Sequence, residues 1–248
     1  PFFLYFSHYA VHTPFQAKKE MIKKYEAVPK ARRQGKPVYA AMVESVDESV
    51  GRIMATLKEL NLDDDTLVIF TSDNGGFAGA TNHAPLRGNK GSYYEGGIRV
   101  PLIISWPGIT KAGEVSKVPV TSSDLYPTCL AAAGLPLHPA QHRDGRDLGP
   151  VLKGAKSMDR DALFWHYPHY NQHPSSVPSS VMRKGDWKLI ETFDPEGVEL
   201  YHLGRDLSET TNLAKKEPAK LAELRKELAA WRKEVDAETM EPNPDHRP

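Results

Sequence analysis

The clearest pattern in the chain is a helical spacing of apolar residues between Val38 and Leu60. Apolar side chains recur there at every third or fourth position: Tyr39, Met42, Val43, Val46, Val50, Ile53, Met54, Leu57 and Leu60. Because an α-helix completes a turn in about 3.6 residues, this spacing places them along one side of a helix of about six turns. The pattern therefore predicts a long amphipathic helix with one face against a core.

Three apolar runs before and after this helix indicate strands. Residues 2–7 are nearly all aromatic or aliphatic, which is typical of a strand buried on both faces. Further runs lie at residues 67–70 and 98–106, and residues 122–136 have the capping residues and stop signals of a short helix. The order strand, helix, strand, strand, helix predicts an α/β domain with a mostly parallel sheet flanked by helices.

The pattern changes after about residue 160. Residues 179–191 alternate in character on both sides of a Gly-Asp turn, and residues 197–203 form another short apolar stretch, which together predict a small antiparallel sheet. Residues 216–237 have apolar positions at helical spacing and predict a closing helix. We therefore expect a partial α/β domain over residues 1–160 and an α+β subdomain over residues 161–248.

Composition and charge exclude several classes of partner. The chain of 248 residues has 32 basic (Lys+Arg) and 32 acidic residues, so no net field favours nucleic acid or an anionic membrane. An apolar content of 40% is that of a globular protein, and no apolar run approaches the roughly 18 residues that a membrane helix requires. The single cysteine, Cys129, excludes an internal disulfide, and its neighbours predict a buried structural thiol.

The first ten residues lack the features of a signal peptide. They contain no initiator methionine, no basic segment and no cleavage site, and a strand is predicted almost from the first residue. Since domains rarely begin inside a core strand, we expect the chain to be a fragment whose upstream part is missing.

Asp73 and Asn74 closely follow the strand predicted at residues 67–70. The carboxyl ends of strands are where an α/β sheet gathers its functional groups. Both side chains offer hard oxygen ligands, which suit Ca²⁺ or Mg²⁺ rather than Zn²⁺. An Asx turn closed by Gly75 and Gly76 is the alternative interpretation of the same residues.

Lys90 lies between Gly88 and Gly91 in a glycine-rich loop that is predicted to return to the same edge of the sheet. A lysine flanked by glycines can present its ammonium group to a bound anion, and Arg87 is a weaker candidate for the same task. An ordinary surface lysine is the alternative. Glu95, which precedes two glycines, is expected to fix the loop rather than to react.

Histidines supply the remaining candidates. His12 follows the first predicted strand, so a base or acid, a metal pair and a cation all lie near strand ends, and this combination favours a site that processes an oxyanion. His83, His166 and His169 are candidates for contacting a substrate. The last two belong to an aromatic segment that also contains His173, for which a zinc site or purely structural histidines are the alternatives.

Six segments together resemble the central and C-terminal parts of a type I, formylglycine-dependent sulfatase of the arylsulfatase family. They are HTP, FTSDNGG, LRGNKGSYYEGGIRVPLIISWPG, DLYPT, VMRKGDWKLI and ELYHLGRDLSETTNL, in this order. No single motif is decisive, but their order and spacing make the resemblance specific over nearly the whole chain. It implies an alkaline-phosphatase-like α/β fold without its N-terminal part, followed by a small antiparallel sheet with a closing helix.

The resemblance also assigns roles to residues. In that family a calcium ion held by four acidic or amide side chains binds the sulfate, and two of its ligands match Asp73 and Asn74. A lysine that contacts the sulfate matches Lys90, and a histidine near the leaving oxygen matches His12. The family's nucleophile is a hydrated formylglycine made from a Cys or Ser in a C/S-x-P-S/A-R motif. A periplasmic, secreted or lysosomal location is also implied.

The sequence departs from the family pattern in one respect. Its only cysteine lies in PTCLAA, the segment HPSSVPSSVMR does not reproduce the serine form of the motif, and the upstream metal ligands are absent. We therefore expect the formylglycine to lie in upstream polypeptide. The intact parent is expected to hydrolyse aryl or carbohydrate sulfate esters, and this chain alone is expected to be inactive.

Two other functions remain open. One is a noncatalytic scaffold that binds a sulfated glycan. The other is a different phosphoesterase of the alkaline phosphatase superfamily, which the resemblance disfavours because such enzymes usually hold two transition metals. In each case the expected partner is a small ester or a glycan rather than nucleic acid.

Overall fold

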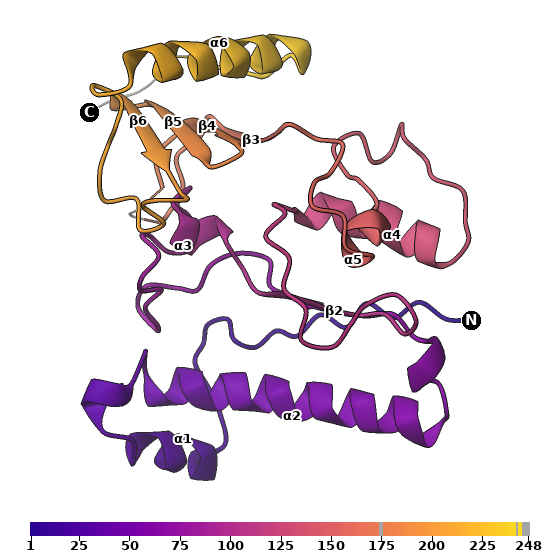
Figure 1. The fold of residues 1–248 in the computed structure, drawn as a ribbon. Coiled ribbons are helices and arrows are strands. Elements are labelled where there is room, and N and C mark those ends of the chain that lie inside the picture. The colour runs from indigo at the N-terminus through magenta and orange to yellow at the C-terminus, as the bar shows by residue number, and fades with distance from the viewer. Residues whose placement is uncertain (174–175, 242, 245–248) are drawn as a thin grey trace. The chain divides into compact units, whose positions relative to one another are not determined.

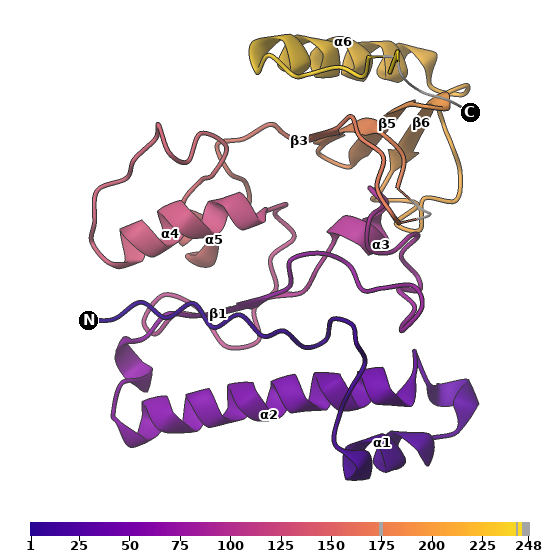
Figure 2. The same cartoon turned by 180° about the vertical axis from the view of Figure 1, so that it is seen from behind.

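The computed structural model describes residues 1–173, 176–241 and 243–244 (Figure 1 and Figure 2). They form two compact units, each assembled from segments that are separate in sequence. The N-terminal unit consists of Pro1–Phe70, Gly76–Asn82 and Leu102–Ala112. The C-terminal unit consists of Thr71–Gly75, His83–Pro101 and the chain from Gly113 onward. The boundary expected at residue 160 coincides with no edge of these units, and it stays a prediction of domain organisation.

The long helix predicted in the N-terminal unit is confirmed. α2 (Pro37–Glu59) begins with a proline, at a position where the missing amide hydrogen would have no helical partner. α1 (Lys19–Glu26) packs against α2 and buries Met21. Two 3₁₀ turns, η1 (Lys30–Arg32) and η2 (Asp63–Asp65), lie before and after α2.

The loop that leads to His83 is held by the segment just before α2. Lys36 N donates a hydrogen bond of 2.8 Å to Ala80 O. A Cβ atom on Gly35 would lie 2.2 Å from the same oxygen, so only glycine permits this approach of the two backbones. The backbone at Ala80 is therefore fixed against the segment before α2, within the N-terminal unit.

Two of the three strands predicted in the first half of the chain are confirmed in shortened form. β1 (Val68–Thr71) and β2 (Leu102–Ser105) pair in a two-stranded sheet. Both are flanked by turn residues, and β2 ends just before the Pro107-Gly108 pair that was expected to close it.

The strand predicted at residues 2–7 is wrong. Residues 1–9 have no regular secondary structure, and their large apolar side chains are exposed, Phe3 by 78% and Tyr5 by 81%. An apolar run shows what a strand would bury, but a strand also requires a neighbouring backbone to accept and donate its hydrogen bonds. Among the described residues, no strand pairs with this segment.

The C-terminal unit contains the predicted antiparallel sheet. Its four strands follow one another in the order of the sequence: β3 (Ala162–Tyr167), β4 (Ser179–Lys184), β5 (Trp187–Phe193) and β6 (Glu196–His202). Gly185 turns β4 into β5 with a φ of 56°, a left-handed conformation that glycine adopts without strain. Lys184 pairs with Trp187 at this end of the hairpin, as the alternation around the Gly-Asp turn predicts.

One face of this sheet is covered by the predicted closing helix, α6 (Pro218–Glu234), which lies along it in Figure 1 and Figure 2. The core between them consists of Met182, Leu189, Leu200, Ala214, Leu224 and Leu228. The ring of Phe164 stacks on that of Trp231 at a centroid distance of 4.6 Å. Glu191 of β5 pairs with two arginines of α6, Arg225 at 2.6 Å and Arg232 at 2.9 Å.

The opposite face of the sheet carries a second apolar cluster. Its buried members are Val181, Ile190, Tyr201 and Leu203, and Tyr93 and Tyr94 pack against them. These two tyrosines lead directly into α3 (Glu95–Ile98), which lies on the side of the sheet away from α6 (Figure 1). The sheet therefore separates α6 from the glycine-rich loop.

The helix predicted over residues 122–136 is present as a 3₁₀ turn, η3 (Ser122–Asp124), followed by α4 (Leu125–Ala132). Asp124 is fully buried, and both of its carboxylate oxygens bind the guanidinium group of Arg160, at 2.8 and 2.9 Å. Asp124 Oδ1 also accepts a 2.8 Å hydrogen bond from Arg146 N, shortly before α5 (Gly149–Leu152). The aspartate of DLYPT therefore holds α4 against the chain that follows it.

Cys129 lies in α4 and is half-buried. Burial raises the pKa of its thiol. Because the thiolate is the reactive form, a raised pKa favours the structural role that the sequence predicts. Within the described part of the chain, no helix is long and apolar enough to span a membrane.

Candidate functional site

The candidate site is assembled on the glycines of α3. A Cβ atom on Gly96 would lie 2.5 Å from Gly88 O, and one on Gly97 would lie 2.0 Å from Ser92 O. Atoms that close would collide, so the loop over residues 87–92 can approach α3 only because both positions are glycine. Gly96 N donates a 2.7 Å hydrogen bond to Arg87 O and fixes one end of the loop.

Lys90 lies at the centre of this loop, in a tight turn. Ser92 Oγ donates to Asn89 O at 2.9 Å and accepts from Asn89 N at 3.2 Å, which closes the turn around Lys90. Gly88 and Gly91 have φ values of 80° and 91°, which a residue with a side chain rarely adopts. The backbone conformation on both sides of the half-buried Lys90 is thus fixed. A fixed backbone suits a lysine that presents its ammonium group to a ligand.

Asp73 and Asn74 contact the same short helix through the next residue. Gly75 N donates a 2.8 Å hydrogen bond to Gly97 O, and a Cβ atom on Gly75 would lie 1.9 Å from Gly96 O. The segment of Asp73 and Asn74 and the turn of Lys90 therefore meet at one four-residue element. The structure brings these three predicted site residues into one region of the C-terminal unit.

The side chains of Asp73 and Asn74 bind each other. Asn74 Nδ2 donates to Asp73 Oδ2 at 2.5 Å, and Ser72 Oγ donates to Asn74 O at 3.0 Å. Asp73 is exposed and Asn74 half-buried, so their oxygens are accessible to a cation. A local turn and half of a metal site are both compatible with this arrangement.

The donor set fits Ca²⁺ or Mg²⁺ in kind and supplies part of a coordination shell. Carboxylate and amide oxygens are the ligands that both ions prefer, and Ca²⁺ takes about six to eight of them. Within residues 1–173, 176–241 and 243–244, no group of three or more His, Cys, Asp or Glu side chains could hold a metal. Asp73 and Asn74 would therefore need further ligands from water, substrate or other polypeptide.

Arg87 points toward the antiparallel sheet. Its guanidinium carbon lies 3.8 Å from the centre of the Tyr94 ring, and its Nη1 donates to Tyr201 Oη at 2.8 Å and to Glu209 O at 2.9 Å. Nη1 also lies 3.8 Å from Glu199 Oε2. These contacts explain Arg87 as a structural link between the loop and β6, and its predicted role in substrate binding stays a prediction.

His83 and His12 belong to different units. His83 is half-buried in the C-terminal unit, and burial lowers the pKa of its imidazole, which favours the neutral ring. His12 is exposed in the N-terminal unit, where its Nδ1 lies 3.0 Å from Thr13 O and its ring meets that of Tyr9 edge to face. The proposed roles of both histidines stay predictions.

His166 lies on the face of the sheet that α6 covers. Its Nδ1 is 2.6 Å from Ser180 Oγ, and its Nε2 is 2.6 Å from Glu238 O, beyond the end of α6. Both ring nitrogens therefore have protein partners, and the structure does not bring His166 to the loop of Lys90. His169 is exposed beyond β3, with its ring 5.2 Å from that of Tyr167.

His173 is the histidine that the structure places beside the turn of Lys90. A Cβ atom on Gly91 would lie 2.5 Å from the Cβ of His173, so the two residues are in contact. His173 N is held by a 2.8 Å hydrogen bond to Asn171 Oδ1. The sequence shows three histidines at irregular spacing, and nothing in it distinguishes His173 from the other two.

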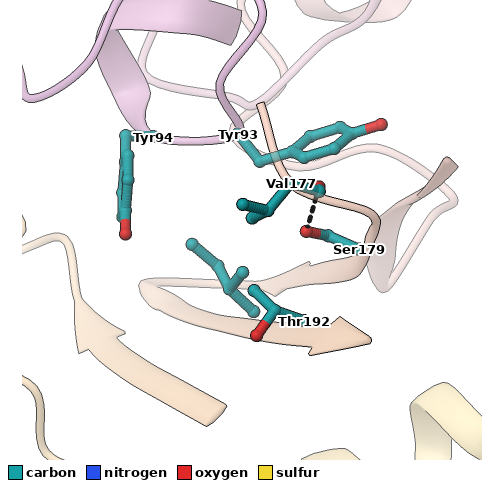
Figure 3. A pocket seen from close by; sticks show the side chains of 6 residues that line it. Tyr93, Tyr94, Val177, Ser179 and Thr192 are labelled. Carbon is teal, nitrogen blue, oxygen red and sulfur yellow. Dashed lines mark hydrogen bonds between the residues drawn. The ribbon is translucent and has the colours of Figure 1, made fainter. Parts of the chain in front are cut away.

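The cleft in Figure 3 is too small to be a substrate pocket. Tyr93 and Tyr94 line it from the loop, Ser179, Ile190 and Thr192 line it from the sheet, and Val177 lines it from the segment before β4. Its volume of about 20 Å³ is room for about one water molecule. Burial in this region raises the pKa of Tyr93 to about 12, so the phenol stays protonated near neutral pH.

Comparison with known families adds to this picture. A family model described as Sulfatase matches residues 1–135, and one described as N-sulphoglucosamine sulphohydrolase, C-terminal, matches residues 89–236. The chain is 38% identical to a sulfatase of Formosa agariphila. The match covers 93% of this chain and 46% of the length of that relative. The chain is also 35% identical to human arylsulfatase A. That match covers 76% of this chain and 35% of the length of the human protein.

Solved structures give the same result for the fold. The crystal structure of Ps i-CgsB matches with a TM-score of 0.80 at 35% identity, over 93% of this chain and 50% of that one. BT4656 in complex with its substrate D-glucosamine-2-N,6-O-disulfate matches with a TM-score of 0.70 at 28% identity, over 84% and 42%. These matches confirm the expected alkaline-phosphatase-like α/β fold. The chain spans half or less of the length of each of these proteins.

Proposed function

Because the chain belongs to the sulfatase family, we propose that the protein hydrolyses sulfate esters. The observation that carries the proposal is the meeting of three candidate groups at α3. Asp73 and Asn74 reach it through the Gly75–Gly97 hydrogen bond, and the turn of Lys90 reaches it through Gly96. Oxygen ligands for a cation and an ammonium group are thus held by the same element, which suits the binding of an anionic sulfate group.

Lys90 is proposed to bind the sulfate group. Its ammonium would donate hydrogen bonds to sulfate oxygens and stabilise the charge that develops on them. His12 is proposed to protonate the departing alkoxide, a role worth about 10²–10⁴ in rate. His83, Arg87, His166 and His169 are retained as candidates for contacts with the rest of the substrate.

Asp73 and Asn74 are proposed to hold a divalent cation, Ca²⁺ or alternatively Mg²⁺. When bound, such an ion supplies a positive charge that polarises sulfate oxygens. The two side chains would orient toward it by exchanging their mutual hydrogen bond for ligation.

The nucleophile is proposed to be a formylglycine supplied by polypeptide outside these 248 residues. The sequence contains no C/S-x-P-S/A-R motif, and Cys129 lies in a helix with a raised thiol pKa. Loss of a nucleophile that works in a concerted set costs on the order of 10⁶ in rate. We therefore propose that the 248-residue chain alone does not turn over sulfate esters.

The proposed substrate class is a sulfated carbohydrate, with an aryl sulfate as the second choice. BT4656 is described in complex with a disulfated glucosamine, and Ps i-CgsB in complex with k-i-k-neocarrahexaose at 34% identity. A location outside the cytoplasm, in the periplasm, the lysosome or the medium, is proposed on the family resemblance and would be checked by cell fractionation.

A noncatalytic scaffold that binds a sulfated glycan is the second candidate function. It is favoured by one observation, the presence of the Lys90 turn in a chain without the nucleophile motif. The hydrolase would release inorganic sulfate from a sulfate ester, and the scaffold would only bind the glycan. Binding of a sulfated glycan by the full-length protein, without release of inorganic sulfate, would replace the hydrolase proposal. Two zinc or manganese ions per full-length protein would instead favour a phosphoesterase.

The experiment compares the full-length protein with its Lys90→Ala variant on an aryl sulfate. Loss of one positioned donor to a developing charge lowers kcat/KM by about 10²–10³. Lys111→Ala, at an exposed loop position, is the matched control and should leave kcat/KM unchanged. Equal activity of the Lys90 variant and the unmodified protein would remove Lys90 from the mechanism.

A further inference from the structure

A buried ion cluster lies at the start of α3, the element on which the candidate site is assembled. Lys188 of β5 is 0% exposed, and its Nζ lies 3.0 Å from Glu95 Oε1 and 2.8 Å from Glu209 Oε1. Glu209 Oε2 also accepts a 2.6 Å hydrogen bond from Glu95 N, the first amide of α3. Side chain and backbone of Glu95 are therefore both held by groups from the sheet side of the C-terminal unit.

Two further cations lie beside the carboxylate of Glu95. Glu95 and Glu209 bring two carboxylates against one buried ammonium. Arg99 Nη1 lies 3.4 Å and Arg183 Nη1 4.0 Å from Glu95 Oε2. Cations from the end of α3, from β4 and from β5 thus surround one carboxylate, and Glu95 cannot move without losing at least one of them.

Such a cluster fixes geometry more than it adds stability. Removing two charges from water is unfavourable, and their attraction inside the protein often no more than offsets that loss. In some proteins a buried ion pair selects one arrangement of the chain, and removal of one partner leaves an uncompensated buried charge. Here the selected arrangement is the position of Glu95 against β5.

The position of Glu95 determines the position of the backbone on which the candidate site rests. α3 has four residues, and the two after Glu95 are the glycines that contact the loop of Lys90 and the segment of Asp73 and Asn74. These contacts join backbone directly to backbone: Gly96 N donates to Arg87 O at 2.7 Å, and Gly75 N donates to Gly97 O at 2.8 Å. A shift of Glu95 therefore moves the surface on which both segments rest.

We infer that Lys188 is a positioning residue for the turn of Lys90, acting through Glu95 and α3. Its effect on the geometry of the turn follows from the contacts above. Its bearing on catalysis rests on the proposed function, so the two are tested by separate measurements.

The geometric effect is measured by amide hydrogen exchange on the full-length protein, read by mass spectrometry. Lys188→Met keeps the length of the side chain and removes the charge, leaving Glu95 and Glu209 without their shared partner. Exchange should rise about tenfold or more in peptides covering residues 71–76 and 86–98, because these segments depend on α3. Peptides from α4 should keep their exchange rates.

Asp124→Asn is the matched control, because it weakens the ion pair of another fully buried carboxylate in the same unit. It should raise exchange around α4 and leave residues 71–76 and 86–98 unchanged. If Lys188→Met does not fold, Glu209→Gln gives a milder test, since glutamine keeps an oxygen for Glu95 N. Unchanged exchange over residues 86–98, or an equal rise in all peptides, would overturn the inference.

The catalytic consequence is measured by the inhibition constant of inorganic sulfate, the product of the proposed reaction. Lys188→Met should raise this constant about tenfold, as for the loss of one hydrogen bond to a charged group. In a Lys90→Ala background it should have no further effect, because the group that it positions is gone. Additive effects would show that Lys188 does not act through Lys90. Absence of sulfatase activity would refute the proposed function and leave the exchange experiment to decide the inference.

Discussion

Residues 2–6 and residues 187–193 are both rich in apolar side chains, yet they end in opposite environments. In the second segment, strand β5, Leu189 is 0% and Ile190 is 4% exposed. In the first, Phe3 and Tyr5 are 78% and 81% exposed. The apolar character of the two segments does not explain the difference. β5 pairs with β4 on one edge and with β6 on the other, whereas residues 2–6 have no paired strand among the described residues.

The difference shows that an apolar run forms a strand only where a partner strand is present. β3 to β6 are consecutive strands of the chain and α6 is the next element, so the whole layer is present within residues 162–234. A segment with no partner strand among the described residues has the same apolar pattern and forms no sheet. The following predictions measure that contrast, from the largest effect to the smallest.

Truncation of a core residue should affect the two regions very differently. Leu189→Ala should lower the free energy of unfolding by about 2–5 kcal/mol, because it removes buried methyl groups and leaves a cavity between the sheet and α6. Phe3→Ala should change it by about 0.5 kcal/mol or less, as at other exposed positions. Urea unfolding followed by tryptophan fluorescence measures both. Similar losses in the two variants would show that residues 2–6 are packed after all.

Addition of a methyl group should change the stability in opposite directions at Gly75, beside α3, and at Gly51, in α2. Gly75→Ala should destabilise by about 1–3 kcal/mol, because its Cβ would lie 1.9 Å from Gly96 O and neither backbone can move freely. Gly51→Ala, in α2, meets nothing within 4 Å and should stabilise by about 0.8–1.0 kcal/mol, the helix preference for alanine. Thermal unfolding measures both changes. A Gly75 variant as stable as the unmodified protein would mean that the segment of Asp73 does not contact α3.

The smallest effect is a pH dependence of stability from Glu209. Burial raises the pKa of its carboxyl above the ordinary value of 4.5, although Lys188 opposes this rise. A group whose pKa is raised on folding adds stability below its unfolded pKa and loses it as the pH rises through the folded value. The stability of the unmodified protein relative to Glu209→Gln should therefore fall as the pH rises from about 4.5. Urea unfolding between pH 4 and pH 7 measures it, and a rise with pH would contradict the assignment.

The elements that the sequence predicts well are those determined by nearby residues. The helix expected over residues 38–60 is α2, and the hairpin expected around Gly185 is β4 and β5. In both cases the periodicity and the terminal residues lie within one stretch of the chain. The strand expected at residues 2–7 failed because its pattern contains no information about a partner.

The residues of the candidate site were predictable from the sequence, but the contacts that hold these residues together were less so. Glycines beside Lys90 and after Asn74 indicate close backbone approach, and the structure shows which atoms they approach. The burial of Lys188 was not predictable, because its partner Glu95 lies 93 residues away. His166 and His173 differ in the side of the sheet that they reach, and spacing among three histidines does not reveal that difference.

The alternation of faces along β5 has a consequence for how the hairpin assembles. Lys188 points to the two glutamates, and its neighbour Leu189 points into the apolar layer beneath α6. A displacement of β5 by one residue would drive an ammonium group among leucines and set a leucine between two carboxylates, an exchange that no rotamer change can repair. The lysine thereby excludes the out-of-step hairpin during folding, before any ligand is present to select the correct one.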